Sequence, residues 1–336
     1  MMMMAIQNTD DERKWIRIMM PNTKSQIVSL CVQGDVTEVL QYIHDHKPNL
    51  PELRLLERRY TRRFYSENAR LHIPTQDRWI QDVLSAYYDY FIEVLTKRVS
   101  AEQGEHLLHT RLNSCIPTPT TDLDETERKL ELLFKDKGYN FLGGYTRPYR
   151  GPYIWQKNSA EEFQVSLPYG EQTVIVNFMH HFLMLSWLHF ASFGWGSTGG
   201  WATSHGLYCV YNRYKHILHK DAFLVSYLKH EGQHLMDMRM YPNMAQVDLE
   251  YRAKLVELIY YQDAECLIKF AQEAKEDECF PHSHASYQII TALDKQFWGD
   301  GQIKALDRYY GIPYKEIAAY SRTLLDEHTA SLIVTS

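Results

Sequence analysis

A predicted helix over residues 221–240 constrains the fold of this chain more than any other segment, because it carries two histidines four positions apart, His230 and His234. Apolar residues recur in it with helical spacing, and Pro242 just beyond it is a stop, because proline cannot continue the hydrogen-bond ladder. Side chains at positions i and i+4 share one face of a helix and lie about 6 Å apart along its axis. Both imidazoles can therefore reach a single metal ion.

Glu231 lies between the two histidines, where its carboxylate can take a proton from a metal-activated water. Two histidines leave a tetrahedral zinc site one protein ligand short, and a carboxylate on the next helix is the usual completion. A second helix is predicted from about residue 245 to 274, and Glu250 near its start is the preferred third ligand. Asp248 and Glu257 on the same helix are rival ligands.

The sequence HEGQH, followed by EYRA on the next predicted helix, resembles the paired motifs of the gluzincin branch of the zincin metallopeptidases. The resemblance covers about residues 200–275. It implies a zincin-like catalytic domain in which His230, His234 and Glu250 bind Zn²⁺. It also implies that Glu231 is the general base in the hydrolysis of a peptide or protein substrate.

One position departs from the pattern of that family. Many gluzincins carry an aspartate four residues after the ligand glutamate, where it holds the other ring nitrogen of a histidine ligand, and this chain has Lys254 there. Metal-bound histidines generally need such a partner. We therefore expect another carboxylate, Asp237 or Asp248, to support the ligands.

A further protein group commonly stabilises the oxyanion that forms when water attacks a carbonyl. Tyr261 is our first candidate for this role, because it lies three turns after Glu250 on the predicted second helix. The alternatives are Tyr241, Tyr260, His282 and His284.

The glycine-rich stretch before the histidine helix offers candidate substrate-binding residues, Gly199, Gly200 and Trp201. In a zincin-like domain an edge strand lies along the substrate cleft, and the backbone here would pair with an extended peptide. The two glycines suit a tight turn equally well. His205 in the same stretch is a candidate for lining the cleft or, alternatively, a surface histidine.

The bulk composition fits a globular chain and argues against several partners. With 336 residues and 45% hydrophobic content, the chain can bury a substantial core. The net charge of −6 and the lack of a lysine-rich run argue against a nucleic-acid partner. No apolar run reaches the length of about 18 residues that a membrane span needs. Five scattered cysteines and the lack of a hydrophobic signal segment favour a reducing, cytoplasmic location.

The periodicity of the chain predicts an α+β class that is mostly helical, in two regions. Residues 1–138 form a helical N-terminal region, and residues 139–336 form the zincin-like catalytic domain. Within that domain we expect a small antiparallel sheet, a buried helix inside the sheet region, the metal helices and the C-terminal helices, at 139–215, 180–196, 221–275 and 285–333.

The predicted function is that of a zinc-dependent metallopeptidase, and two alternatives remain open. Two histidines and a carboxylate also form the facial triad of non-haem iron enzymes, so the same ligands suit a metal-dependent enzyme of other chemistry, including a non-peptide hydrolase. Glu231 favours hydrolysis, because an iron oxygenase needs no base there. The second alternative is a peptidase-like binding protein without turnover, or simply a core helix whose histidines serve packing. Nothing in the sequence indicates an oligomeric state.

Overall fold

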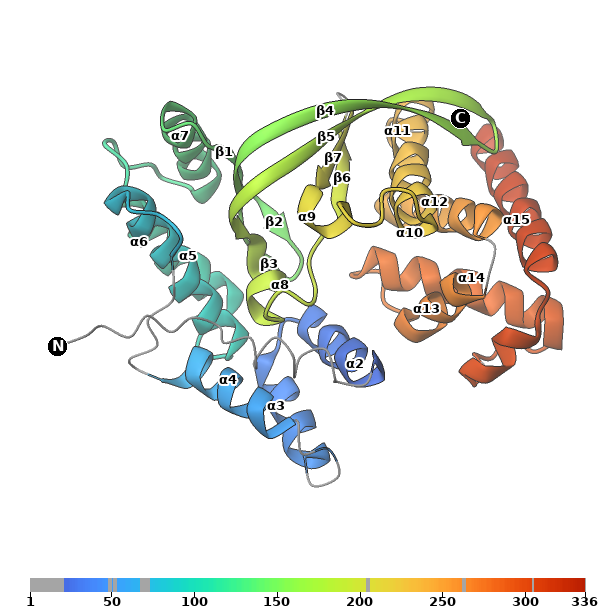
Figure 1. Ribbon diagram of the computed structural model, residues 1–336, viewed down its shortest axis with the longest axis horizontal. Helices are drawn as coiled ribbons and strands as arrows, with labels where there is room; N and C mark the ends of the chain where they lie inside the picture. Colours follow the sequence, from blue (N-terminus) through green and yellow to red (C-terminus); the bar gives the residue numbers. More distant parts are fainter. Residues whose placement is uncertain are drawn as a thin grey trace. The chain divides into compact units, whose positions relative to one another are not determined.

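Figure 1 shows the computed structural model of the chain, which describes residues 21–47, 50, 53–66, 73–203, 206–261, 264–303 and 305–335. The described residues fall into two compact units. The first contains the chain up to residue 156 together with 181–197, and the second contains 157–180 together with 198–336. Each unit has its own hydrophobic core. The described residues are mostly helical with one small mixed sheet, so the predicted α+β class is confirmed.

The domain boundary predicted after residue 138 differs from this division. Two long strands, β4 (Tyr153–Leu167) and β5 (Gly170–Leu185), each contribute to both units. The change in the sequence pattern from helical to β-rich marks where the strands begin. It does not mark the residue at which one packed unit ends and the other starts. The division therefore lies within the strands, at residues that the periodicity does not single out.

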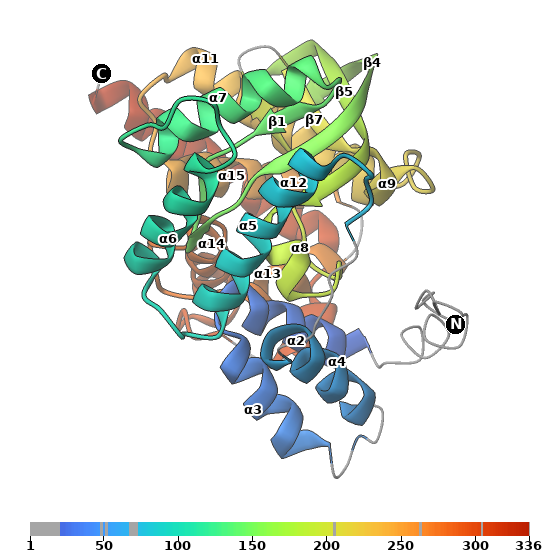
Figure 2. The same ribbon diagram turned by 90° about the vertical axis from the view of Figure 1, so that its left-hand side faces the viewer.

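The first unit is built mainly of helices, as expected for the N-terminal region. These are α2 (Pro21–Val32), α3 (Val36–His46), α4 (Leu53–Tyr65), α5 (Arg78–Leu95), α6 (Ala101–Asn113), α7 (Leu123–Asp136) and the short α8 (Ser186–Ala191). Asp35, Asp77 and Asp122 cap three of them by accepting bonds from backbone N–H groups. α5 and α6 pack against each other (Figure 2), and the apolar faces of these helices enclose the first core.

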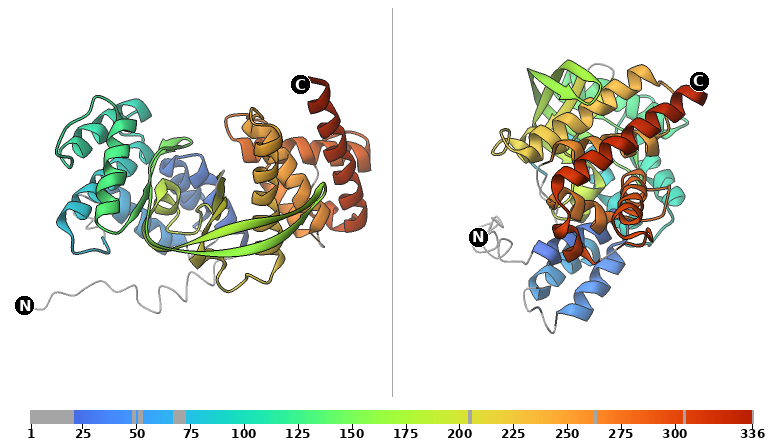
Figure 3. Two further views of the ribbon diagram at one scale, coloured as in Figure 1. Left: turned by 90° about the horizontal axis from the view of Figure 1, so that it is seen from above. Right: turned by 90° about the vertical axis from the view of Figure 1, so that its right-hand side faces the viewer.

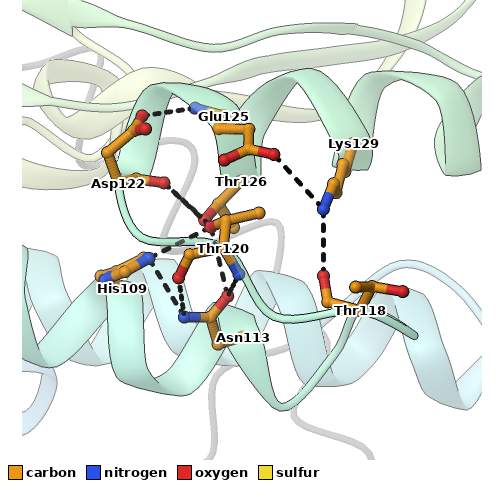
Figure 4. A network of polar contacts seen from close by, with 8 residues as sticks. All are labelled: His109, Asn113, Thr118, Thr120, Asp122, Glu125, Thr126 and Lys129. Carbon is orange, nitrogen blue, oxygen red and sulfur yellow. Dashed lines mark hydrogen bonds and ion pairs between the residues drawn. The ribbon is translucent and has the colours of Figure 1, made fainter.

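The connection between α6 and α7 is held by a polar network (Figure 4). The Asn113 side chain accepts a hydrogen bond from the backbone N–H of Thr120 at 3.0 Å, and the His109 ring lies 3.2 Å from the Thr120 hydroxyl. The Thr120 and Thr126 hydroxyls are themselves in hydrogen-bond contact. This proline-containing linker is thus an ordered turn whose polar groups are satisfied by the helices on either side.

The sheet has five strands in the order β1-β4-β5-β7-β6. At one edge β1 (Asn140–Leu142) pairs antiparallel with β4, and at the other β6 (Gly200–Thr203) pairs antiparallel with β7 (Gly206–Val210). β5 and β7 run parallel, so the prediction of an antiparallel sheet is wrong for this pair. Parallel neighbours need a crossover connection, and α8 lies within it. A separate ribbon joins β2 (Tyr145–Thr146) and β3 (Tyr149–Arg150).

The buried helix predicted over 180–196 is also wrong in its first part. β5 continues to Leu185 before α8 begins. Within β5, Val174 and Val176 are buried while Ile175 between them is exposed, which is the alternation of a strand with one face on a core. The following run HHFLML is apolar without a clear period, and such a run does not separate a strand from a buried helix.

The predicted histidine helix lies in the second unit. Residues 221–240 form one helical stretch made of α10 (Asp221–Phe223), a π-helical segment η1 (Leu224–Lys229) and α11 (His230–Met240), which ends before Pro242 as predicted. The single helix predicted over 245–274 is interrupted. α12 (Gln246–Tyr260) ends where Tyr261 adopts an extended backbone, and α13 (Glu265–Glu273) follows.

The C-terminal part is helical, in agreement with the prediction. It contains α14 (Pro281–Trp298), the 3₁₀ segment η2 (Leu306–Gly311) and α15 (Tyr314–Thr335), and a four-residue helix α9 (Tyr211–Tyr214) lies earlier, after β7. Gly299 ends α14 in the left-handed conformation, with φ of 84°, which suits a residue without a Cβ. No helix in the described part of the chain combines the length and apolarity needed to cross a membrane.

α12 packs against α11, α14 and α15, as Figure 3 shows from two sides. Arg252 of α12 is 1% exposed and joins three of these helices. Its Nε donates to Oδ2 of Asp237 on α11 at 2.9 Å, and its Nη1 donates to Oγ1 of Thr329 on α15 at 2.8 Å. A charge this deeply buried is tolerated when it is paired and hydrogen-bonded. The pairing fixes α12 relative to α11, and so places Glu250 against the two histidines.

Replacing Arg252 by Met should lower the free energy of unfolding by about 3–5 kcal/mol, because it leaves the buried carboxylate of Asp237 without its cation. The control is Glu125→Gln, which removes an exposed i,i+4 ion pair with Lys129 on α7 and should cost less than about 1 kcal/mol. Urea unfolding of the two variants measures both effects. Equal losses would contradict the role given to Arg252.

Candidate metal centre

Three side chains from α11 and α12 converge in the second unit. Nε2 of His230 lies 3.1 Å from Nε2 of His234 and 3.4 Å from Oε2 of Glu250. Nε2 of His234 lies 3.6 Å from Oε1 of the same carboxylate. All three residues are buried, with 5–8% of their surface exposed. The structure therefore brings together the three side chains that the sequence predicted as ligands.

These separations suit a bound metal ion. Zinc–nitrogen and zinc–oxygen bonds of about 2.0–2.2 Å in a tetrahedral arrangement place neighbouring ligand atoms about 3.3–3.6 Å apart. Two of the observed distances, 3.4 and 3.6 Å, lie in that range, and the third, 3.1 Å, is slightly shorter. A search of the described residues for three or more His, Cys, Asp or Glu side chains whose donor atoms could share an ion finds this one group. The group could hold a metal ion.

The electrostatics of the group are those of donors that share a positive charge. Burial lowers the pKa of His230, but the carboxylates of Glu250 and Glu257 outweigh it and raise that pKa to about 10. Burial raises the pKa of Glu250, whereas the neighbouring histidines, His282 first among them, hold it well below its usual range. Without a metal, the group therefore keeps a proton among its donors at neutral pH. A divalent cation has to displace that proton.

Glu257 supports the first histidine ligand. Its Oε1 lies 2.7 Å from Nδ1 of His230, and both side chains are buried. Glu257 follows Glu250 by seven residues, which is close to two helical turns, so both carboxylates point from the same face of α12 toward His230. Glu257 thus contacts the ring of His230 from a position about one turn beyond Lys254 on α12.

The two carboxylates predicted for that support are engaged elsewhere. Asp237 pairs with Arg252, and Asp248 lies 3.3 Å from Nε2 of His328 on α15. The expectation that one of them holds a histidine ligand is therefore not met. The sequence signal for Glu257 was its spacing from Glu250, which also made it a rival ligand.

Lys254 stands where the aspartate was expected, and it balances the added negative charge. Its side chain is 5% exposed, its Nζ bonds the carboxylate of Glu273, and it lies 4.1 Å from the ring centre of Phe270. Burial lowers the pKa of Lys254, and the carboxylates of Glu273 and Glu257 more than restore it. A cation at this position stabilises the ionised form of Glu257, which accepts the hydrogen of the His230 ring.

Glu231 lies on α11, between the two histidines in the sequence. Its side chain is half-buried, one position after His230 and therefore off the face that carries the two imidazoles. Burial raises the pKa values of Cys209, Tyr214 and Tyr227, and the nearby Glu231 carboxylate raises them further. Glu231 thus faces the side of α11 on which β7, α9 and η1 lie.

The predicted substrate residues lie at the edge of the sheet. β6 begins at Gly200 and is the last strand in the sheet order, and it packs against α11. A Cβ on Gly199 would stand 2.1 Å from the Tyr214 hydroxyl, and one on Gly200 would stand 2.0 Å from the Tyr208 carbonyl oxygen. Close packing thus accounts for both glycines. The Trp201 ring stacks on Tyr208 with 5.8 Å between centres. His205 lies outside the described residues.

Tyr261 is not brought to the group. It is 7% exposed, with Lys269 over its ring. Eleven residues of helix separate it from Glu250, which is about 16 Å along the axis. Three of the alternatives also have other neighbours. Lys229 lies 3.9 Å from the ring centre of Tyr260, and Arg252 lies 5.7 Å from the ring centre of Tyr241. The ring centres of His284 and Tyr287 are 6.2 Å apart.

His282 is the alternative that reaches the centre. Its Nδ1 lies 2.9 Å from Oε2 of Glu250, and its ring is nearly parallel to that of His230, with 6.2 Å between centres. Its side chain is 63% exposed, in contrast to the three buried donors. It comes from the first turn of α14, and no spacing in the sequence relates it to the histidine helix. Tertiary packing alone reveals it.

Replacing Glu257 by Leu should weaken metal affinity by about 10–100-fold, because the change removes the acceptor that orients His230 and keeps the side-chain volume similar. Competition with a chromophoric chelator measures the affinity. Asp248→Asn is the control and should leave it unchanged, because Asp248 contacts His328. If the two variants bound metal equally well, the supporting role of Glu257 would be wrong.

Metal affinity should rise about tenfold per pH unit between pH 6 and 8, because binding must release the proton held with a pKa of about 10 at His230. Calorimetry in two buffers of different ionisation enthalpy should register that release. The stability of the metal-free protein should depend on pH in the opposite direction to metal affinity. The stability that protonated His230 contributes is complete below pH 6.5, the ordinary pKa of histidine, and is lost as pH rises through about 10. A pH-independent affinity would contradict this account.

In comparisons with protein-family models, curated proteins and solved structures, the chain has no match. Its function must therefore be inferred from the residues of the site and their surroundings.

Proposed function

We propose that this chain is a zinc-dependent peptide-bond hydrolase related to the gluzincin branch of the zincin metallopeptidases. The observation that carries the proposal is the convergence of the His230 and His234 imidazoles with the Glu250 carboxylate at separations of 3.1–3.6 Å. Imidazole and carboxylate donors suit zinc. Zinc bound there would lower the pKa of a water molecule to about 7 and polarise a carbonyl group.

Glu231 would be the general base. It lies between the two histidines in the sequence of α11 and off the face that carries them, and its carboxylate is not in the donor group. It would take a proton from the attacking water and pass it to the nitrogen of the departing amine as the C–N bond breaks. Its half-buried position favours this role, because a carboxylate partly shielded from water interacts more strongly with a proton donor.

The β6 edge supports a peptide as the substrate. Tyr214 and Tyr227 pack under Gly199 and Gly200, and both tyrosines lie close enough to Glu231 for its charge to raise their pKa values, in addition to the effect of burial. The general base and the glycine end of β6 therefore share one neighbourhood. An extended peptide that paired with this edge strand would run beside α11.

Replacing Glu231 by Gln should leave metal content unchanged and lower turnover by at least about 100-fold, because the amide cannot accept the proton. Replacing His230 by Ala should remove the metal. Glu276→Gln, which changes an exposed glutamate on the loop after α13, is the control and should keep both properties. The measurements are zinc content by atomic spectroscopy and cleavage of a fluorogenic peptide library with and without chelator.

Two results would contradict the proposal. Full activity of Glu231→Gln would remove the general-base assignment. A zinc-loaded protein that cleaves no peptide in the library, or one whose activity returns with iron and not with zinc, would point to one of the alternative functions.

A further inference from the structure

His282 is the solvent-facing neighbour of the metal centre. Its Nδ1 lies 2.9 Å from Oε2 of Glu250, while its side chain is 63% exposed and that of Glu250 is 6% exposed. It is not a member of the donor group formed by His230, His234 and Glu250. Its contact is with one ligand, Glu250, and it approaches that ligand from a different helix.

The packing of α14 on α12 determines where His282 lies. Glu250 and Lys254 are four residues apart on α12, and His282 and Ser286 are four residues apart on α14, so each pair shares one helix face. His282 meets Glu250 directly. Ser286 donates to Oε1 of Glu273 at 2.6 Å, and the same oxygen bonds Lys254. These two contacts, one helical turn apart, fix the register of the helices.

This arrangement parallels the support of His230. Glu257 contacts Nδ1 of His230, and His282 contacts Oε2 of Glu250, the oxygen that also faces His230. A glutamate side chain has three rotatable bonds, and fixing them before the metal arrives lowers the entropy lost on binding. Partners of this kind commonly change metal affinity by about 10–100-fold.

We propose that His282 is a positioning residue of the metal centre, which holds the Glu250 carboxylate toward His230 and His234 through Nδ1. The inference rests on the proposed metal site and does not depend on the substrate. This role differs from that of a fourth metal ligand and from that of a group that acts on substrate. Each of those roles would use Nε2 of His282 or a different orientation of its ring, whereas the contact with Glu250 uses Nδ1.

Substitution by Asn tests the role, because its amide nitrogen can take the position of Nδ1 while the rest of the imidazole is lost. Cobalt affinity, by chelator competition, and the visible absorption of the cobalt-loaded full-length protein are measured for wild type, His282→Ala and His282→Asn. We expect His282→Ala to weaken affinity by about 10–100-fold and to alter the absorption bands. We expect His282→Asn to restore most of both.

His284→Asn is the matched control, since His284 lies two residues along α14 and its ring faces Tyr287. It should match wild type. Thermal unfolding of the metal-free proteins shows whether each variant is folded before its affinity is compared.

Three results would overturn the inference. His282→Ala with wild-type affinity would leave His282 without a role at the metal. His282→Asn as weak as His282→Ala would assign the effect to the other side of the ring, as a ligand would require. A wild-type protein that bound no cobalt or zinc would remove both this inference and the proposed function. If the affinity series held but no peptide were cleaved, only the proposed hydrolase activity would fail.

Discussion

The second unit depends on a buried cluster of paired charges between α11 and α12. Taking an ionised group out of water costs several kcal/mol, and the cost is offset only when partners surround it. Here the partners form a chain, in which Glu250 and Glu257 flank His230, Lys254 faces Glu257, and Glu273 bonds Lys254. The apolar core of the unit packs around these helices and shields most of the cluster from water, while Glu273 at its end is 41% exposed. The same contacts that make the donors stable also leave them aimed at one point.

The parts of the site that follow from local spacing could be predicted from the sequence. His230 and His234 share a helix face because they are four residues apart. The helix ends before Pro242 and a second helix follows, so Glu250 on that second helix can lie opposite the two histidines. The supporting residues could be predicted only in part. Glu257 lies on the same face as Glu250, but the spacing does not tell a ligand from a ligand's partner. His282 depends on the register of α14, which tertiary contacts set.

The fold was predictable where the periodicity was strong. The helices of both units show it, and they account for the mostly helical α+β class. The sheet was mispredicted because its long strands contain turn-forming residues and an apolar run without a clear period, so that part of β5 resembled a helix. The parallel pairing of β5 with β7 joins segments about thirty residues apart, and no local signal distinguishes it from an antiparallel hairpin.

A π-helical turn, η1, lies directly before His230 in the helical stretch that carries the two imidazoles. One residue more or less in a helix rotates everything beyond it by about 100°, and η1 accommodates such an extra residue. Within η1, Leu224 is 36% exposed, whereas Val225 is 4% exposed. Deleting one residue from this segment would return it to a regular α-helix and leave the parts before and after it facing as they do now. The π-helical turn therefore lets the helix carry one more residue without turning the two rings away from Glu250.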